Sequence, residues 1–160
     1  KDGEKLSINW LTYPTRLEQP KLAEYAQATL KDIGIDVVVN NTSDHMTIAK
    51  SGDFDVYVSS TTTAPTGDPG YFFTSTVTGV KNYGNYQNEE VTKLTDQLHQ
   101  TFDKDERGKL AVELQQDILD DDAFFFVSHL NMGIVTKSNV KGMAAHPCDY
   151  YEITADLDVE

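Results

Sequence analysis

Cysteine is almost absent from this chain of 160 residues, which contains only Cys148. A single thiol cannot form an internal disulfide, and it cannot build a metal site from several thiolates. Long apolar runs are absent too, since no segment approaches the roughly 18 to 20 residues that a membrane helix requires. The opening segment, KDGEKLSINW, lacks the apolar core of a secretion signal. If the parent protein is exported, we expect its targeting segment to lie outside this sequence.

Positive charge is also scarce. The chain carries 13 Lys and Arg against 26 Asp and Glu, which gives a net charge of −13 and an isoelectric point near 4.5. Nucleic-acid binding requires a cationic surface, so we expect no nucleic-acid partner. The same charge disfavours adsorption to anionic lipid, and solubility is the simplest explanation of the acidity.

The motifs that commonly mark enzymes are missing. The chain has no GxSxG elbow, no Walker motif and no GxGxxG segment after a strand. We therefore expect a protein without catalytic activity. A stand-alone hydrolase or metal-dependent enzyme remains the rival, and it predicts a pocket lined by His and carboxylates with shifted pKa values. A structural interaction domain, which predicts a broad exposed apolar patch, is the third alternative.

What is present is a pattern of alternating strands and helices. With 39% hydrophobic residues, the chain can fill one core but not two comfortable ones. Apolar periodicity and caps predict a strand with Leu6, Ile8 and Trp10, and then a helix from Pro20 that stops at Gly34. A second strand, Ile35–Val39, is expected next. It is followed by a short helix capped by Ser43 and by a third strand with Phe54, Val56 and Val58. Strands joined through helices pair in parallel, so this half predicts an α/β sheet.

The second half predicts two longer helices. Asn88 caps the first, whose apolar face is Val91, Leu94, Leu98 and Phe102. Asp103 and Glu106 resemble a capping box for the second, with the stripe Leu110, Leu114 and Ile118. Two strands, Ala123–Val127 and Met132–Thr136, are expected to follow.

The segment from Gly52 to Phe73 is the most informative part of the chain. The strand run GDFDVYVSS leads into a loop, TTTAPTGDP, which closes on Phe72 and Phe73. An ordinary connection takes only about four to six residues. Long ordered loops at strand ends are where α/β proteins hold ligands, so we look for function here.

Metal-ligating residues give only weak patterns. His146 and Cys148 are the most tempting pair, but Pro147 between them restricts how both could converge on one ion. The other histidines, His45, His99 and His129, are isolated in sequence. Asp120–Asp122 lacks the spacing of a calcium loop and is typical of a solvated helix end. We therefore expect no cofactor and no metal site built from these residues alone.

Three landmarks resemble the solute-binding proteins of ABC importers, specifically the peptide/nickel class. The first is the turn and helix TYPTRLEQPKLAEYAQATLKDIGIDVVV, which places Tyr13, Pro14, Arg16, Glu18, Pro20, Ala23, Gln27, Leu30, Ile33, Gly34 and Ile35 at positions typical of that class. The second is the loop with Ala64-Pro65 and Asp68-Pro69 before Phe72-Phe73. The third is the helix pair followed by the apolar run near Phe124. Together they cover roughly Leu6 to Gly142.

The resemblance implies a fold and a domain organisation. It implies a mixed, mainly parallel sheet flanked by helices, as in one lobe of a type II periplasmic-binding-protein-like fold. Residues 1–142 would form the C-terminal ligand-binding lobe of a longer two-lobe protein, and residues 143–160 would cross back to the N-terminal lobe. The implied partners are a small molecule or metal chelate, that other lobe and an ABC permease. The implied location is extracytoplasmic, in the periplasm or lipid-anchored at the cell surface.

The resemblance also implies ligand-binding residues. The loop residues Thr61, Thr62, Thr63, Ala64, Pro65 and Thr66 would contact ligand through hydroxyls and backbone groups, with Tyr83 and Tyr86 as aromatic walls. The alternative is that the threonines satisfy loop backbone groups and the tyrosines belong to the core.

Departures from the class pattern bear on the ligand. Dipeptide binders of the class usually carry an Asp where Pro65 stands and a Trp where Thr62 stands. Ala64-Pro65 and the Tyr-Pro-x-Arg turn are closer to the nickel-type members, although VTGVKNYGNYQ lacks the histidine that these can place after the loop. The transported ligand is therefore expected to be nickel, held as a small chelate, with an oligopeptide or dipeptide as the alternative.

Overall fold

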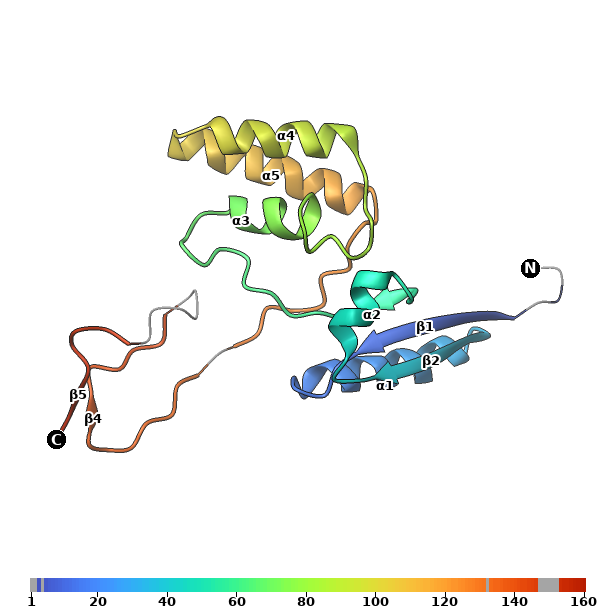
Figure 1. Cartoon of the computed structure of the whole chain (residues 1–160), viewed down its shortest axis with the longest axis horizontal. Coiled ribbons are helices and arrows are strands. Elements are labelled where there is room, and N and C mark those ends of the chain that lie inside the picture. Colours follow the sequence, from blue (N-terminus) through green and yellow to red (C-terminus); the bar gives the residue numbers. More distant parts are fainter. Residues whose placement is uncertain (1–2, 4, 132, 147–152) are drawn as a thin grey trace. The chain divides into compact units, whose positions relative to one another are not determined.

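The structure is a computed structural model that describes residues 3, 5–131, 133–146 and 153–160. The chain forms two compact units, Lys1–Thr61 and Thr62–Glu160 (Figure 1). The division into residues 1–142 and 143–160 stays a prediction. None of the described helices is both long and apolar enough to cross a lipid bilayer.

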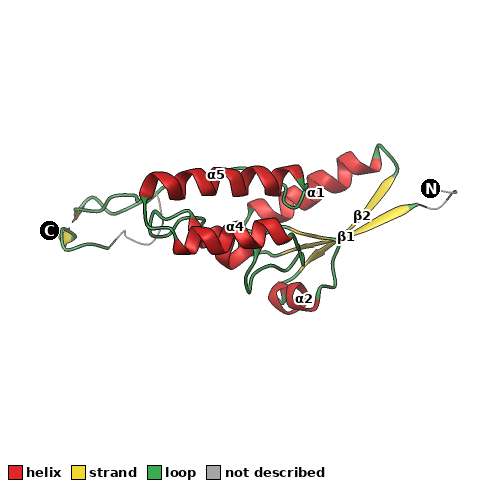
Figure 2. Ribbon diagram, turned by 90° about the horizontal axis from the view of Figure 1, so that it is seen from above, coloured by secondary structure: helices red, strands yellow, loops and turns green. Residues whose placement is uncertain are grey.

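The first unit is a three-stranded parallel sheet with two helices. Its elements are β1 (Leu6–Thr12), α1 (Glu18–Lys31), β2 (Ile35–Asn41), α2 (His45–Ser51) and β3 (Val56–Tyr57). The strand order is β2-β1-β3, with Leu6 opposite Ile35 and Trp10 opposite Val56. Figure 2 shows β1 and β2 side by side. The two predicted β-α-β steps are therefore confirmed, and β3 is shorter than expected.

Local signals set most helix ends in this unit. Gly34 adopts a φ of +85° just beyond α1, which confirms it as the stop signal. Ile33 lies past Lys31, the last helical residue, and its side chain is exposed. Ser43 is not the cap of α2, because the helix begins one residue later, with Asp44 at its N-cap.

The second unit is built around a helical core. Its elements are α3 (Gly70–Phe72), the π-helix η1 (Phe73–Val77), α4 (Glu89–Gln100), α5 (Lys104–Asp120) and the antiparallel pair β4 (Val140–Lys141) and β5 (Asp158–Val159). Figure 2 shows α4 and α5 running together. The core residues are Phe72, Phe73, Val77, Val91, Leu94, Leu98, Leu110, Ala111, Leu114 and Ile118.

The predicted caps of the two long helices are confirmed. The Asn88 side chain accepts hydrogen bonds from the backbone of Glu90 and Val91. The Asp103 side chain accepts from Asp105 and Glu106. Each cap satisfies amide groups that the first turn of a helix leaves without partners.

Two predictions in this unit are wrong. Phe102 does not share the buried face of α4, because the helix ends at Gln100 and the ring is 92% exposed. The described residues of 123–127 and 132–136 form no strands. Their apolar composition favours a strand, but no strand among the described residues pairs with them, and a strand requires a partner for its backbone groups.

Candidate ligand-binding loop

The loop that follows β3 carries the predicted site residues. Thr61 ends the first unit, and Thr62 to Thr66 begin the second. Thr61, Thr63 and Thr66 are exposed, whereas Thr62 and Ala64 are half-buried. Pro65 is buried.

A tight turn shapes the middle of this loop. The backbone N–H of Gly67 donates to the Ala64 carbonyl at 3.0 Å. Gly67 has a φ of +78°, which side chains rarely tolerate. The turn leaves the Thr66 side chain exposed at its surface.

An ion pair fixes the far end of the loop. Arg107 Nη2 lies 2.7 and 2.6 Å from the two carboxylate oxygens of Asp68. Arg107 Nη1 donates to the carbonyls of Leu98 and Thr101, where α4 ends. Asp68 in turn accepts from the N–H of Gly70 at 2.7 Å, at the start of α3. The guanidinium of Arg107, a residue of α5, therefore connects this helix with the loop and with the end of α4, and Asp68 extends the connection to α3.

The charge state of Asp68 follows from this pairing. Burial alone would raise the pKa of the carboxyl group, but the hydrogen bonds and charge of Arg107 outweigh it, and the pKa lies below its ordinary value of 3.8. A Cβ atom at position 70 would lie 2.8 Å from Asp68 Oδ1, so a residue larger than Gly70 would displace this carboxylate.

A ring cluster fixes the near end of the loop. The N–H of Ser60 donates to the Tyr13 hydroxyl at 3.3 Å, one residue before Thr61. Tyr13 stacks on His45, with ring centroids 4.1 Å apart. His45 Nδ1 lies 2.8 Å from the hydroxyl of Tyr57.

The two predicted aromatic walls lie in the second unit. Tyr83 is half-buried. Tyr86 packs edge-on against Phe124, with centroids 6.3 Å apart, and its hydroxyl donates to Asp121 Oδ2 at 2.6 Å. Asn88 donates to the same oxygen at 2.7 Å, which links the cap of α4 to the end of α5.

This network shifts two pKa values. Burial and the Asp121 carboxylate raise the pKa of Tyr86 to about 12. The hydrogen bonds from Tyr86 and Asn88 lower the pKa of Asp121. Both shifts have a structural cause in the pairing of α4 with α5, and neither requires a catalytic role.

An open groove of about 960 Å³ lies along α4 in the described part of the second unit, and a shallow hollow of similar volume lies along α5. The lining of the groove along α4 is rich in amides, and Tyr86 is the sole predicted site residue in it. Loop residues 62–66 do not line it, so the structure does not bring Tyr86 and the loop together around this groove. The lining contains no histidine, unlike the pocket that the enzyme hypothesis predicts.

The weak metal candidates gain no support. His146 is exposed, and Cys148 lies outside the described residues. Within the described ranges, no group of three or more His, Cys, Asp or Glu side chains could hold a metal ion. The cluster Asp120–Asp122 is engaged in local bonds, with Asp121 held by the Tyr86 network and Asp120 accepting from Gln116 at 2.8 Å.

Sequence reasoning missed both anchors of the loop. Arg107 and Asp68 are 39 residues apart, and the rings of Tyr13, His45 and Tyr57 come from three different segments. Asp68-Pro69-Gly70 did carry a signal, because an acidic residue before Pro is typical of a helix start. The partner of that acid had no signal in the sequence.

The fold and the loop define a class of protein. A parallel sheet with connecting helices, followed by an anchored loop and a helical pair, is the arrangement expected of a lobe of an importer receptor. The comparison with known families agrees, since residues 1–84 match the bacterial extracellular solute-binding proteins, family 5 middle domain. The chain belongs to this family, which confirms the class inferred from the sequence motifs.

Nickel-binding proteins are among the individual relatives that this chain resembles. It is 28% identical over 167 aligned positions to the nickel-binding protein NikA of Staphylococcus aureus. The structure of that NikA in complex with Ni(L-His)2 superimposes with a TM-score of 0.78, at 26% identity over 99% of this chain and 36% of NikA. A nickel ABC transporter structure from Bacillus halodurans gives a TM-score of 0.67, at 32% identity over 76% of this chain and 26% of that one.

Peptide receptors share the fold. The oligopeptide-binding protein AppA of Bacillus subtilis, solved with a nonapeptide, gives a TM-score of 0.77 at 24% identity, over 94% of this chain and 31% of AppA. These likenesses confirm the predicted fold, a mainly parallel sheet with flanking helices as in a type II periplasmic binding protein. The chain spans about a third of the length of these relatives.

Proposed function

We propose that this chain is part of the receptor of an ABC importer, and that the receptor captures nickel as a small chelate without chemically changing it. The observation that carries the proposal is the likeness to NikA over the whole chain, at a TM-score of 0.78. The receptor would act outside the cytoplasm, in the periplasm or lipid-anchored, and would deliver its cargo to an ABC permease. Binding would favour a closed state of the full-length protein through contacts made only in that state.

The ligand would contact the exposed part of the loop. Thr61, Thr63 and Thr66 offer hydroxyl groups at the surface, which suit the carboxylate and amine groups of a chelator. Within the second unit, the ion pair of Asp68 with Arg107 would hold the end of the loop in place, which lowers the entropic cost of binding.

A peptide is the second candidate, and the likeness to AppA favours it. The loop itself argues for the chelate, because the buried Pro65 stands where the resemblance implies an acidic anchor for the amino terminus of a peptide. A receptor for peptides would have to provide that anchor elsewhere.

Isothermal titration of the full-length protein with Ni(L-His)2 and with a nonapeptide tests the proposal. We expect the nickel complex to bind and the peptide not to bind. Replacing Thr63 and Thr66 together by Val should weaken nickel binding by about 10-fold, since each hydrogen bond contributes roughly 0.5–1.5 kcal/mol. Thr15→Val, at an exposed turn, is the matched control and should leave affinity unchanged. Peptide binding with no response to the nickel complex would overturn the proposal.

A further inference from the structure

Arg107, a residue of α5, holds the end of the candidate ligand-binding loop from outside the loop. Asp68 is the only charged residue between Asp55 and Lys81, so this segment can form an ion pair through Asp68 alone. Its partner, Arg107, follows 39 residues later and lies near the start of α5. The side chain of Arg107 is 19% exposed and that of Asp68 is 43% exposed, so water shields the pair only in part.

The terminal nitrogens of the Arg107 guanidinium are fully engaged. Nη2 donates to both carboxylate oxygens of Asp68, and Nη1 donates to the backbone carbonyls of Leu98 and Thr101. These bonds use all four N–H groups of the two terminal nitrogens. The two carbonyls lie at the end of α4, where the last turn of a helix leaves such groups without partners. Arg107 therefore ties Asp68 to α4 and α5, whose buried faces belong to the core of the second unit.

The segment just before Asp68 has few restraints of its own. Gly67 has a φ of +78°, and glycine reaches several backbone conformations at similar energy. The exposed Thr66 directly precedes this glycine. One hydrogen bond, from the Gly67 N–H to the Ala64 carbonyl, closes the turn, and a single bond of this kind contributes little to stability. The fixed position of Asp68 therefore limits the directions that the Thr66 side chain can take.

We infer that Arg107 is a positioning residue for ligand binding, acting through Asp68 on the loop residues Thr63 and Thr66. This inference rests on the proposed function, in which these two hydroxyls contact the ligand. A loop that is already held in one conformation loses less conformational entropy when the ligand binds. All four residues belong to the second unit, so the inference depends on the geometry of that unit alone.

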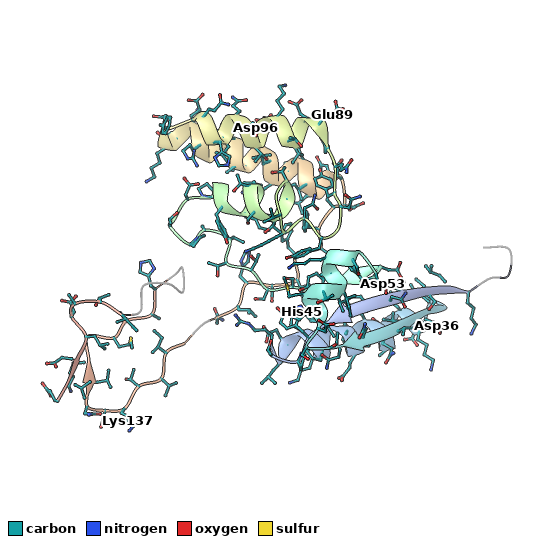
Figure 3. All side chains as sticks on the ribbon, in the orientation of Figure 1. Asp36, His45, Asp53, Glu89, Asp96 and Lys137 are labelled. Carbon is teal, nitrogen blue, oxygen red and sulfur yellow. The ribbon has the colours of Figure 1, made fainter. Side chains whose placement is uncertain are left out.

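Isothermal titration of the full-length protein with Ni(L-His)2 tests this role. Arg107→Lys keeps the charge but offers three N–H donors on a single nitrogen, too few for four acceptors, and should raise Kd about 10-fold. Asp68→Asn keeps the shape of the side chain without its charge, and should raise Kd about 3-fold. The matched controls are Lys109→Arg, at an exposed position on α5, and Asp96→Asn, at an exposed position on α4 (Figure 3). Neither control should change Kd.

A combined variant separates positioning from a general effect on stability. Replacing Thr63 and Thr66 together by Val should raise Kd about 10-fold in the wild type but only about 2-fold in Arg107→Lys, because the hydroxyls are already misplaced there. A purely structural role predicts the same factor in both backgrounds. Hydrogen exchange of the ligand-free protein adds a second readout. The Gly67 N–H should exchange about 10-fold faster in Arg107→Lys, whereas N–H groups within α1 should keep their wild-type rates.

The outcomes distinguish this role from the proposed function. If the wild type and Arg107→Lys bind Ni(L-His)2 equally well, the role of Arg107 is overturned and the proposed function stands. Equal factors for the threonine pair in both backgrounds, or an unchanged exchange rate at Gly67, also overturn the role. If the wild type binds only the nonapeptide, the proposed function falls, and the same variants titrated with the peptide decide the role of Arg107. If it binds neither ligand, both proposals fall together.

Discussion

Arg107 shows how one side chain organises several segments of the second unit. Its planar guanidinium spans both oxygens of Asp68, and its other nitrogen reaches the carbonyls where α4 ends. A lysine has neither the planar fork nor enough donors for these contacts. Because the Arg107 side chain is only 19% exposed, water screens this pair less than it screens the surface pair Lys93–Glu90. The geometry of the candidate ligand-binding loop therefore depends on a residue outside it.

The hydrogen bond of Tyr86 leads to a prediction about how the stability of the protein depends on pH. Its folded pKa of about 12 exceeds the ordinary value of 10.0, so its contribution to stability is complete below pH 10 and is lost as pH rises from 10 to 12. The pKa of Asp121 is lowered. The stability that its carboxylate contributes is therefore present above pH 3.8 and is lost as the pH falls further. We expect Tyr86→Phe to lower the melting temperature by about 2 °C at pH 7.

Thermal unfolding of the full-length wild type and Tyr86→Phe between pH 5 and 11 checks this. The difference between the two proteins should be constant from about pH 5 to 9 and should shrink above pH 10. Tyr71→Phe is a control outside the Asp121 network. A difference that stays the same up to pH 11 would contradict the assigned pairing.

At the scale of elements, the sequence predicted what local chemistry determines. Asn88 and Asp103 cap their helices as expected, because a cap needs only its own first turn. The strand expected at Ala123–Val127 depends on a partner elsewhere, and its β-prone composition could not reveal whether one is present. The π-helix η1 was not predicted, since its wider turns have no composition signal that separates them from a loop.

The close packing of Gly79, just after η1, leads to a prediction about stability. Gly79 packs so closely that a Cβ atom would lie 2.0 Å from the Thr74 carbonyl oxygen, which is backbone and cannot rotate away. Gly79→Ala should therefore lower the free energy of unfolding by about 2 kcal/mol. Gly108→Ala is the matched control, because Gly108 lies inside α5 with open space around it, and there Ala should stabilise by up to about 1 kcal/mol.

Thermal unfolding of the two full-length variants, followed by circular dichroism, measures these opposite effects. We expect the melting temperature to fall for Gly79→Ala and to rise for Gly108→Ala. An unchanged melting temperature for Gly79→Ala would mean that the backbone relaxes there at no cost, and that η1 does not require the close approach.

At the scale of the whole molecule, the second unit exposes a run of large apolar side chains between residues 125 and 135. The exposed members are Phe125, Phe126, Val127, Leu130, Ile134 and Val135, with Phe125 90% and Val135 99% exposed. Monomeric proteins rarely expose so many apolar side chains together. An interaction domain would also show such a patch. The relatives are about three times as long as this chain, and we propose that further sequence of the receptor covers these side chains.

That view leads to a prediction about binding by residues 1–160 alone. If the ligand lies between this chain and further sequence of the receptor, the isolated chain lacks one wall of the site and should bind Ni(L-His)2 at least about 100-fold more weakly than the full-length protein, a loss of about 2.7 kcal/mol. Isothermal titration of both proteins measures the ratio, and circular dichroism shows whether the isolated chain is folded. Submicromolar binding by the folded chain alone would mean that residues 1–160 hold a complete site, and the second wall would then be unnecessary.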